Sequence, residues 1–173
     1  MPEFEHRATA PDSIAVFVVT LSDTRTVATD TSGQTIRDAL TAAGHRVTGT
    51  TILREDPATL PSELAALLHD PTADAVVVTG GTGVGPHDLA FDVLAPLYES
   101  PIPGFGELFR MLSYQEIGSA ALLSRASAGI AHGKVIFSVP GSRGAVRLAL
   151  DQLILPELAH LVGELRRPPG AAP

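Results

Sequence analysis

A short run of glycine and threonine follows one apolar segment and precedes two aspartates. The residues are Thr79-Gly80-Gly81-Thr82-Gly83, directly after Ala75-Val76-Val77-Val78, with Asp88 and Asp92 beyond them. Glycines at the end of a strand let backbone N–H groups approach a ligand closely, and phosphate is the ligand most often bound in this way. The carboxylates would repel phosphate unless a divalent cation lay between them. The pattern therefore predicts a metal–phosphate or metal–nucleotide site.

Two common nucleotide-binding motifs do not match this turn. Neither Gly-Lys-Ser nor Gly-Lys-Thr follows it, which excludes a Walker A loop. In the dinucleotide-binding pattern the third glycine would fall at Pro86 or Asp88, which disfavours a Rossmann dehydrogenase. A simpler interpretation stays open: the turn is only a tight connection, and Asp88 and Asp92, spaced i, i+4, favour a helix N-terminus. We expect Asp88 to be functional and Asp92 to be structural.

Three further polar segments follow predicted strands: Ser22-Asp23, Glu55-Asp56-Pro57 and Pro140-Gly141-Ser142-Arg143-Gly144. Ligands of parallel α/β sheets bind outside the carboxyl ends of the strands, so the fold should bring these segments together with the glycine turn. Each also has a plain structural interpretation, as a polar turn at 55–57 or as a helix start capped by Ser142. The serines show no Gly-x-Ser-x-Gly motif, and the histidines show no metal-ligand spacing. The convergence of the four segments is therefore a stronger signal than any one of them.

Strand and helix patterns alternate along the chain and must position these segments. Strands are predicted at residues 14–20, 47–53, 75–79 and 134–139, and helices at 36–43, 60–68, 91–98, 105–114 and 146–162. Residues 101–104 should break the chain, Pro156 should kink the last helix, and 118–129 stay ambiguous between helix and other structure. The alternation predicts one α/β domain, a three-layer αβα sandwich with a mostly parallel sheet. We expect the domain at residues 13–164, between flexible tails at 1–12 and 165–173.

The composition narrows the class of protein. The chain has 173 residues, of which 45% are hydrophobic and 18% charged, which is typical of a compact globular domain. A formal net charge of −7 argues against broad binding to nucleic acid or to anionic membranes. The chain has no cysteine, which removes disulfides and cysteine nucleophiles, and no apolar run approaches the ~20 residues of a membrane span. The polar start lacks the apolar stretch of a signal peptide, so we expect a cytoplasmic protein.

Several motifs in one order resemble the MoaB/Mog family of molybdenum cofactor biosynthesis proteins, which includes the molybdopterin adenylyltransferases. The matching segments are Ser22-Asp23-Thr24-Arg25, Thr79–Gly83 with Asp88, Pro103-Gly104-Phe105-Gly106-Glu107-Leu108-Phe109-Arg110, Leu123-Ser124-Arg125 and Pro140-Gly141-Ser142. The similarity extends from about residue 14 to residue 162. It implies a compact α/β domain that forms homo-trimers, sometimes paired into hexamers, and that works with other proteins of the pathway. It also implies a pocket for molybdopterin and for ATP with Mg²⁺, in which AMP is transferred from ATP to the terminal phosphate of molybdopterin.

The resemblance also implies roles for single residues. Asp88 would take the catalytic aspartate position, with Glu55 or Asp56 as a second carboxylate and with Asp88 and Glu55 as metal ligands. The nucleotide or pterin phosphates would face the glycine turn and the first loop; these residues are Thr79, Gly80, Gly81, Thr82, Gly83, Ser22 and Asp23. The pterin side would be formed by Ser124, Arg125, Pro140, Gly141, Ser142 and Glu107. No side-chain nucleophile is required, because the phosphate of molybdopterin attacks.

Two departures from the family pattern bear on activity. After the second strand the family commonly has Pro-Asp and another acidic residue, whereas this chain has Arg54-Glu55-Asp56. After the glycine turn the family often has Asp-Val-Thr-Pro, whereas this chain has Asp88-Leu89-Ala90-Phe91. A rival hypothesis is therefore a non-catalytic molybdopterin-binding or scaffold protein of the same pathway.

Overall fold

The computed structural model describes residues 11–168, and its centre is a six-stranded sheet in the order β2-β1-β3-β6-β5-β4. The strands are β1 (Ala15–Leu21), β2 (Arg46–Leu53), β3 (Ala75–Thr79), β4 (Ser100–Pro101), β5 (Ser127–Ala131) and β6 (Lys134–Val139). β2, β1, β3 and β6 are mutually parallel, while β5 and β4 add an antiparallel edge. The expected α/β fold with a mostly parallel sheet is confirmed.

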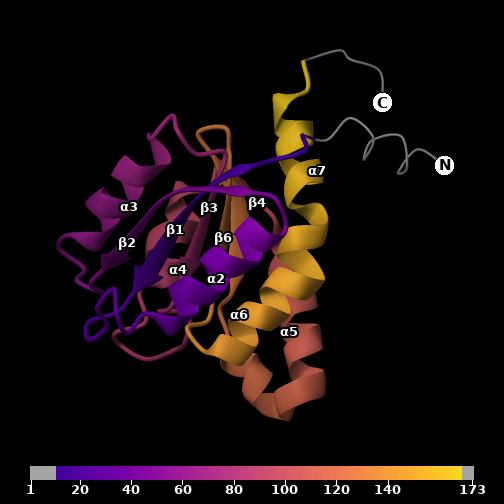
Figure 1. Cartoon of the computed structure of the whole chain (residues 1–173). Coiled ribbons are helices and arrows are strands. Elements are labelled where there is room, and N and C mark those ends of the chain that lie inside the picture. Colours follow the sequence, from indigo (N-terminus) through magenta and orange to yellow (C-terminus); the bar gives the residue numbers. More distant parts are fainter. Residues whose placement is uncertain (1–10, 169–173) are drawn as a thin grey trace.

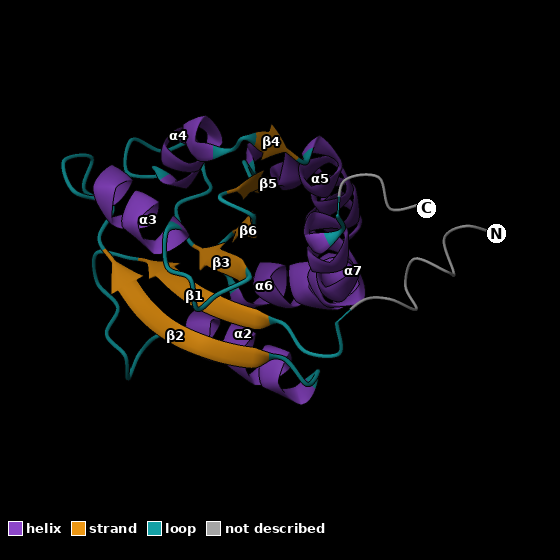
Figure 2. Cartoon of the chain, turned by 90° about the horizontal axis from the view of Figure 1, so that it is seen from above, coloured by secondary structure: helices purple, strands orange, loops and turns teal. Residues whose placement is uncertain are grey.

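Helices cover both faces of the sheet, which makes the three layers (Figures 1 and 2). They are α2 (Thr31–Ala42), α3 (Leu60–Leu68), α4 (Ala90–Leu94), α5 (Pro103–Ile117), α6 (Arg143–Ala149) and α7 (Leu155–Arg166). Alternate residues of each central strand enter two different cores. Val77 and Phe137 pack with α2, α5, α6 and α7, whereas Val78 and Ile136 pack with α3 and α4. Burial on both faces explains why these strands are continuous apolar runs in the sequence.

The helix ends follow local signals in the sequence. Asp30 precedes α2 and accepts a hydrogen bond from the Gly33 amide at 2.9 Å, while Gly44, just beyond the helix, has φ +85°. Pro103 lies in the first turn of α5, where a proline needs no hydrogen-bond donor, so the expected break at 101–104 is instead a helix start. Pro96 similarly ends α4 early, and residues 95–97 of the predicted 91–98 helix form a 3₁₀ turn.

The ambiguous segment at 118–129 resolves into a 3₁₀ turn (Gly118–Leu123) and the start of β5. β5 and β6 form a hairpin whose two connecting residues, His132 and Gly133, both have positive φ, as tight hairpin turns require. β5 contains the small residues Ala128 and Gly129, and the ring of Tyr98 lies directly over Gly129. The antiparallel edge therefore depends on tertiary packing that the sequence pattern does not display.

The last helical region confirms the expected interruption near Pro156. A π-helical segment (Leu150–Ile154) joins α6 to α7, and Pro156 lies in the first turn of α7. α7 extends to Arg166, so the predicted tail at 165–173 begins too early. Leu165 packs against the core and Arg166 forms an ion pair with Asp74, which together hold the helix end in place.

Asp74, just before β3, joins both ends of the described chain. Its Oδ2 accepts a hydrogen bond from the Ala15 amide at 3.0 Å, and its Oδ1 pairs with Arg166. β1 therefore begins, and α7 ends, at the amino edge of the sheet (Figure 1). The remaining residues of the two expected tails, 1–10 and 169–173, lie outside the described residues.

Candidate functional site

The carboxyl edge of the parallel strands brings together most of the predicted site. A cavity of about 280 Å³ is lined there by Gly81, Thr82, Gly83, Asp88, Ser124, Pro140, Gly141 and Ser142, with Phe109, Ser113, Ile117, Ala120, Ala121 and Ala145. These residues come from the loops that follow β3 and β6, from α5 and the 3₁₀ turn after it, and from the first turn of α6. Eight of the sequence-predicted site residues thus line one cavity.

The loop at residues 80–89, here called the site loop, connects β3 to α4 without regular secondary structure. Asp88 folds back on it, because Asp88 Oδ2 accepts the Gly85 amide at 2.8 Å. A Cβ atom at Gly83 would lie 2.5 Å from the same oxygen. The glycine at position 83 therefore allows the carboxylate to sit against the backbone, next to the cavity.

Glu55 approaches the site loop from the end of β2. Its Oε2 accepts a hydrogen bond from the Leu89 amide at 3.0 Å and lies against Gly81, whose φ is +65°. Burial raises the pKa of Glu55, the Leu89 amide opposes this shift, and the nearby charges of Asp88 and Asp23 raise the pKa further. Burial, with the neighbouring acidic groups, therefore disfavours the ionised form of Glu55.

Asp56, the alternative second carboxylate, faces away from this cluster. Its Oδ1 accepts the Ala58 amide at 2.8 Å, which closes a local turn, and the residue is exposed. Both residues lie beyond the end of β2, and of the two it is Glu55 whose carboxylate accepts an amide of the site loop. The structure places Glu55 there.

Ser22 and Asp23 organise the neighbouring loop. The Ser22 hydroxyl accepts the amides of Thr24 at 3.3 Å and Arg25 at 3.1 Å. Asp23 Oδ1 accepts the Glu55 amide at 3.1 Å, so it fixes the backbone beneath the Glu55 side chain. Neither residue lines the cavity, although the charge of Asp23 raises the pKa of Glu55.

Thr79 and Gly80 hold the two glycine turns together. Thr79 Oγ1 donates to the Pro140 carbonyl at 3.0 Å, and the Gly80 amide donates to the Val139 carbonyl at 3.0 Å. Ser32 from α2 donates to the Gly141 carbonyl at 2.7 Å. These bonds fix the 140–142 turn beside the site loop, and the N-cap expected of Ser142 is present, with its Oγ accepting the Ala145 amide at 3.3 Å.

Glu107 does not reach this cavity. It is exposed near the start of α5 and lines a separate groove of about 610 Å³ with Tyr98, Arg110 and others. Ser124 lines both hollows, whereas Arg125 lines only the second.

Tyr98 is a titratable residue of this groove whose pKa is shifted. Burial raises the pKa of Tyr98 to about 12, and a 2.9 Å hydrogen bond with Ser127 opposes this shift.

Arg125 contacts the site loop from the far side. Its guanidinium donates to the carbonyls of Gly83 and Asp88 at 2.7 and 2.6 Å and to both Asp92 oxygens at 3.0 Å. Asp92 is therefore an ion-pair partner of Arg125, in agreement with its predicted structural role.

The cavity residues Phe109 and Ser113 were not predicted. Phe105, Phe109 and Ser113 follow one another at intervals of four, so they share one face of α5. Ser113 is buried. A serine in line with two buried phenylalanines is the signal that could have identified it.

Two findings bear on whether the described residues could bind a metal ion or span a membrane. Within residues 11–168, no three or more histidine, aspartate and glutamate side chains are arranged to hold a metal ion. Mg²⁺ usually needs only one or two carboxylates when phosphates complete its shell, and the crowded oxygens of Glu55 and Asp88 fit that requirement. None of the described helices is long and apolar enough to cross a bilayer.

Known proteins share the sequence and the fold over nearly the whole chain. Residues 17–160 match the family model described as a probable molybdopterin binding domain. Molybdenum cofactor biosynthesis protein B of Bacillus subtilis is 46% identical over 164 residues, covering 94% of this chain and 96% of that protein. The protein of the same name from Staphylococcus aureus is 43% identical over 158 residues, covering 90% and 94%.

Solved structures agree with these relatives. A crystal structure of a molybdenum cofactor biosynthesis protein B has a TM-score of 0.87 at 48% identity, covering 92% of this chain and 99% of that one. The tungsten cofactor synthesizing protein MoaB from Pyrococcus furiosus has a TM-score of 0.80 at 34% identity, covering 91% and 100%. The chain therefore belongs to the MoaB/Mog family of molybdenum cofactor biosynthesis proteins, whose shared unit is the molybdopterin-binding domain.

Proposed function

We propose that the protein is a cytoplasmic molybdopterin adenylyltransferase, which uses ATP and Mg²⁺ to transfer AMP to the terminal phosphate of molybdopterin. The observation that carries this proposal is the convergence of the site loop, Asp88 and the 140–142 turn on one cavity, with Glu55 behind Gly81. Backbone amides, hydroxyls and carboxylates are the groups that phosphoryl and nucleotidyl transfer needs.

The reaction requires alignment more than a side-chain nucleophile. An oxygen of the molybdopterin phosphate forms a bond to the α-phosphorus of ATP while the bond from that phosphorus to the β-phosphate oxygen breaks, and pyrophosphate leaves. Gly81, Thr82 and Gly83 would contact phosphate oxygens, and Ser124 and the 140–142 turn would line the pterin side. Asp88 and Glu55 would hold Mg²⁺, which neutralises phosphate charge when bound.

Asp88→Asn tests the proposal. The amide keeps the shape of the side chain and an oxygen for the Gly85 amide, but it removes the charge. We expect turnover to fall on the order of 10²-fold with an unchanged melting temperature. The assay incubates pure protein with molybdopterin, ATP and Mg²⁺ and detects adenylylated molybdopterin and pyrophosphate by mass.

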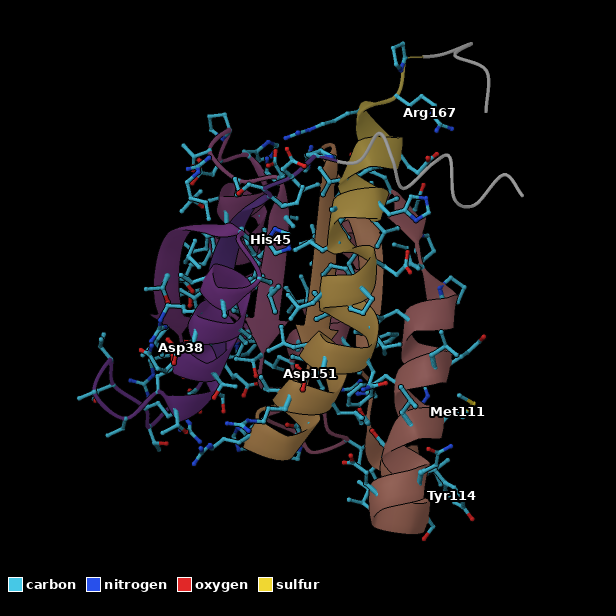
Figure 3. The ribbon with its side chains drawn as sticks, turned by 45° about the vertical axis from the view of Figure 1, so that its right-hand side comes forward. Asp38, His45, Met111, Tyr114, Asp151 and Arg167 are labelled. Carbon is cyan, nitrogen blue, oxygen red and sulfur yellow. The ribbon has the colours of Figure 1, made fainter. Side chains whose placement is uncertain are left out.

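Asp151→Asn is the matched control. Asp151 is exposed on the segment between α6 and α7, and it lines a different hollow together with Asp38 of α2 (Figure 3). It should retain wild-type turnover. Wild-type turnover in Asp88→Asn would remove the role assigned to Asp88.

A second candidate function is molybdopterin binding without adenylyl transfer. The Glu55 side chain favours it, because it is one methylene longer than the family's aspartate and its Oε2 already accepts the Leu89 amide at 3.0 Å. Tight molybdopterin binding without any ATP-dependent product would support this candidate. Product formation that appeared only in Glu55→Asp would identify the cause.

We also propose that the protein assembles with copies of itself as a trimer or hexamer. Large apolar side chains are exposed along α5 and the 3₁₀ turn: Leu108, Met111, Tyr114, Ile117, Leu122 and Leu123. Figure 3 shows Met111 and Tyr114 pointing outward from α5. A continuous exposed apolar face is typical of an interface, and light scattering that showed a monomer at micromolar concentration would refute the assembly.

A further inference from the structure

Arg125 holds the site loop through contacts that leave little of its side chain for a ligand. All three guanidinium nitrogens donate hydrogen bonds: Nε to the Gly83 carbonyl, one terminal nitrogen to the Asp88 carbonyl and the other to both Asp92 oxygens. The planar fork matches these acceptors, and the guanidinium lies 5.6 Å from the centroid of the Phe91 ring. The side chain is 28% exposed.

The backbone of Arg125 adds a further connection. Its amide donates to the Thr82 carbonyl at 2.7 Å, so one residue contacts the site loop at Thr82, Gly83 and Asp88. Arg125 follows the 3₁₀ turn at Gly118–Leu123 and is 37 residues from Asp88 in the sequence. Its contacts therefore join the segment after this 3₁₀ turn to the site loop, and no helix or strand connects the two directly.

The site loop has only two side-chain anchors from outside itself and α4 among the contacts described above. Glu55 binds the Leu89 amide on one side, and Arg125 binds the Gly83 and Asp88 carbonyls on the other. Within the loop, the Asp88 amide donates to the Gly85 carbonyl at 3.1 Å, which closes a turn without fixing it to the domain. Loss of the Arg125 side chain would free the Gly83 and Asp88 carbonyls and leave the loop held by Glu55 and by backbone bonds at Gly80, Gly81 and Thr82.

We propose that Arg125 is a positioning residue, which fixes the site loop and thereby the Asp88 carboxylate, and is not a ligand of the pterin. The expected effect of Arg125 on turnover rests on the proposed adenylyl transfer, whereas its expected effect on the order of the site loop does not. An arginine that were a pterin ligand would need donors aimed at the cavity, whereas Arg125 lines only the groove on the other side of the loop.

Arg125→Lys is the first test variant, because lysine keeps the charge and loses the fork. In ligand-free protein, hydrogen exchange of the amides at residues 83–89 should become at least about tenfold faster, since loop opening then breaks fewer bonds. Asp92→Asn keeps the two carbonyl contacts, so its exchange should accelerate less. Arg46→Lys, an exposed arginine at the start of β2, should exchange like the wild type.

Kinetics with molybdopterin and Mg-ATP provide the second readout. For Arg125→Lys we expect kcat to fall at least about tenfold with KM for molybdopterin within about twofold, because alignment is lost and pterin contacts are kept. Exchange like the wild type would overturn the proposal, as would a tenfold rise in KM at unchanged kcat. If the wild type forms no adenylylated product, the proposed function fails, and the exchange comparison alone still decides the role of Arg125.

Discussion

Gly81→Ala tests the contact between Glu55 and the site loop. Gly81 has φ +65°, a conformation that costs an alanine roughly 1–2 kcal/mol. A Cβ atom there would collide with Glu55 Oε2 and lie 3.3 Å from the Ala90 amide nitrogen. Glu55 would have to move away, and its hydrogen bond to the Leu89 amide would be lost.

The two costs can be added for a first estimate. A hydrogen bond to a charged acceptor contributes about 1.5–3 kcal/mol, so strain and lost bond together predict a decrease of about 2.5–5 kcal/mol in the free energy of unfolding. At about 2–4 °C per kcal/mol for a chain of this size, the melting temperature should fall by about 5–20 °C.

Urea denaturation of four variants separates the two costs. Gly104→Ala is the matched control, because nothing lies within 4 Å of its added Cβ and it sits in the first turn of α5; we expect a change within about 0.5 kcal/mol. Adding Gly81→Ala to Glu55→Ala should cost only the strain, about 1–2 kcal/mol, because the obstructing carboxylate is gone. If Gly81→Ala costs the same in both backgrounds, the contact between Gly81 and Glu55 does not exist as described.

Two further predictions concern buried acids. Because the pKa of Glu55 is raised above its ordinary 4.5, its contribution to stability is complete below that pH and is lost as the pH rises through the raised pKa. The free energy of unfolding of the wild type, relative to Glu55→Gln, should therefore fall from about pH 4 to pH 7 in urea titrations, and a constant difference would contradict the raised pKa. Asp30→Ala should cost about 2–5 kcal/mol, since it removes the N-cap of α2 and leaves the buried Thr20 hydroxyl without its 2.8 Å acceptor. The exposed Asp38→Ala on the same helix should change stability by less than about 0.5 kcal/mol, and equal losses at the two positions would argue against the burial of Asp30.

The central sheet could be predicted because its strands are buried on both faces. Residues 75–78 and 135–137 are uninterrupted apolar runs, which fit strands that are covered on both faces. The convergence of the glycine turn, Glu55 and the 140–142 turn followed from topology, since parallel strands place their carboxyl ends along one edge.

The antiparallel edge could not be predicted in the same way. β5 consists of Ser127, Ala128, Gly129, Ile130 and Ala131, of which only Ile130 has a strong intrinsic strand preference. What makes this segment a strand is its packing against α5, the Tyr98 ring over Gly129 and the tight turn into β6. Such contacts join residues distant in sequence and leave no local periodicity.

The direction of side chains was the second feature that the sequence could not predict. The sequence could not decide between Glu55 and Asp56, because both follow the end of β2 and the backbone path after the strand decides which one reaches the site loop. For Glu107, the sequence predicted the helix but not which of the two hollows the side chain lines. The partners of Arg125 are loop carbonyls, whose positions no motif encodes.

The ion pair of Asp74 with Arg166 has a practical consequence for how the protein can be handled. It gathers both described chain ends at one edge of the sheet, while the candidate cavity opens at the opposite edge. A linker that starts at residue 11 or at residue 168, the ends of the described chain, would therefore leave from the edge opposite the cavity. A protein layer immobilised through either position would keep the candidate cavity facing the solution.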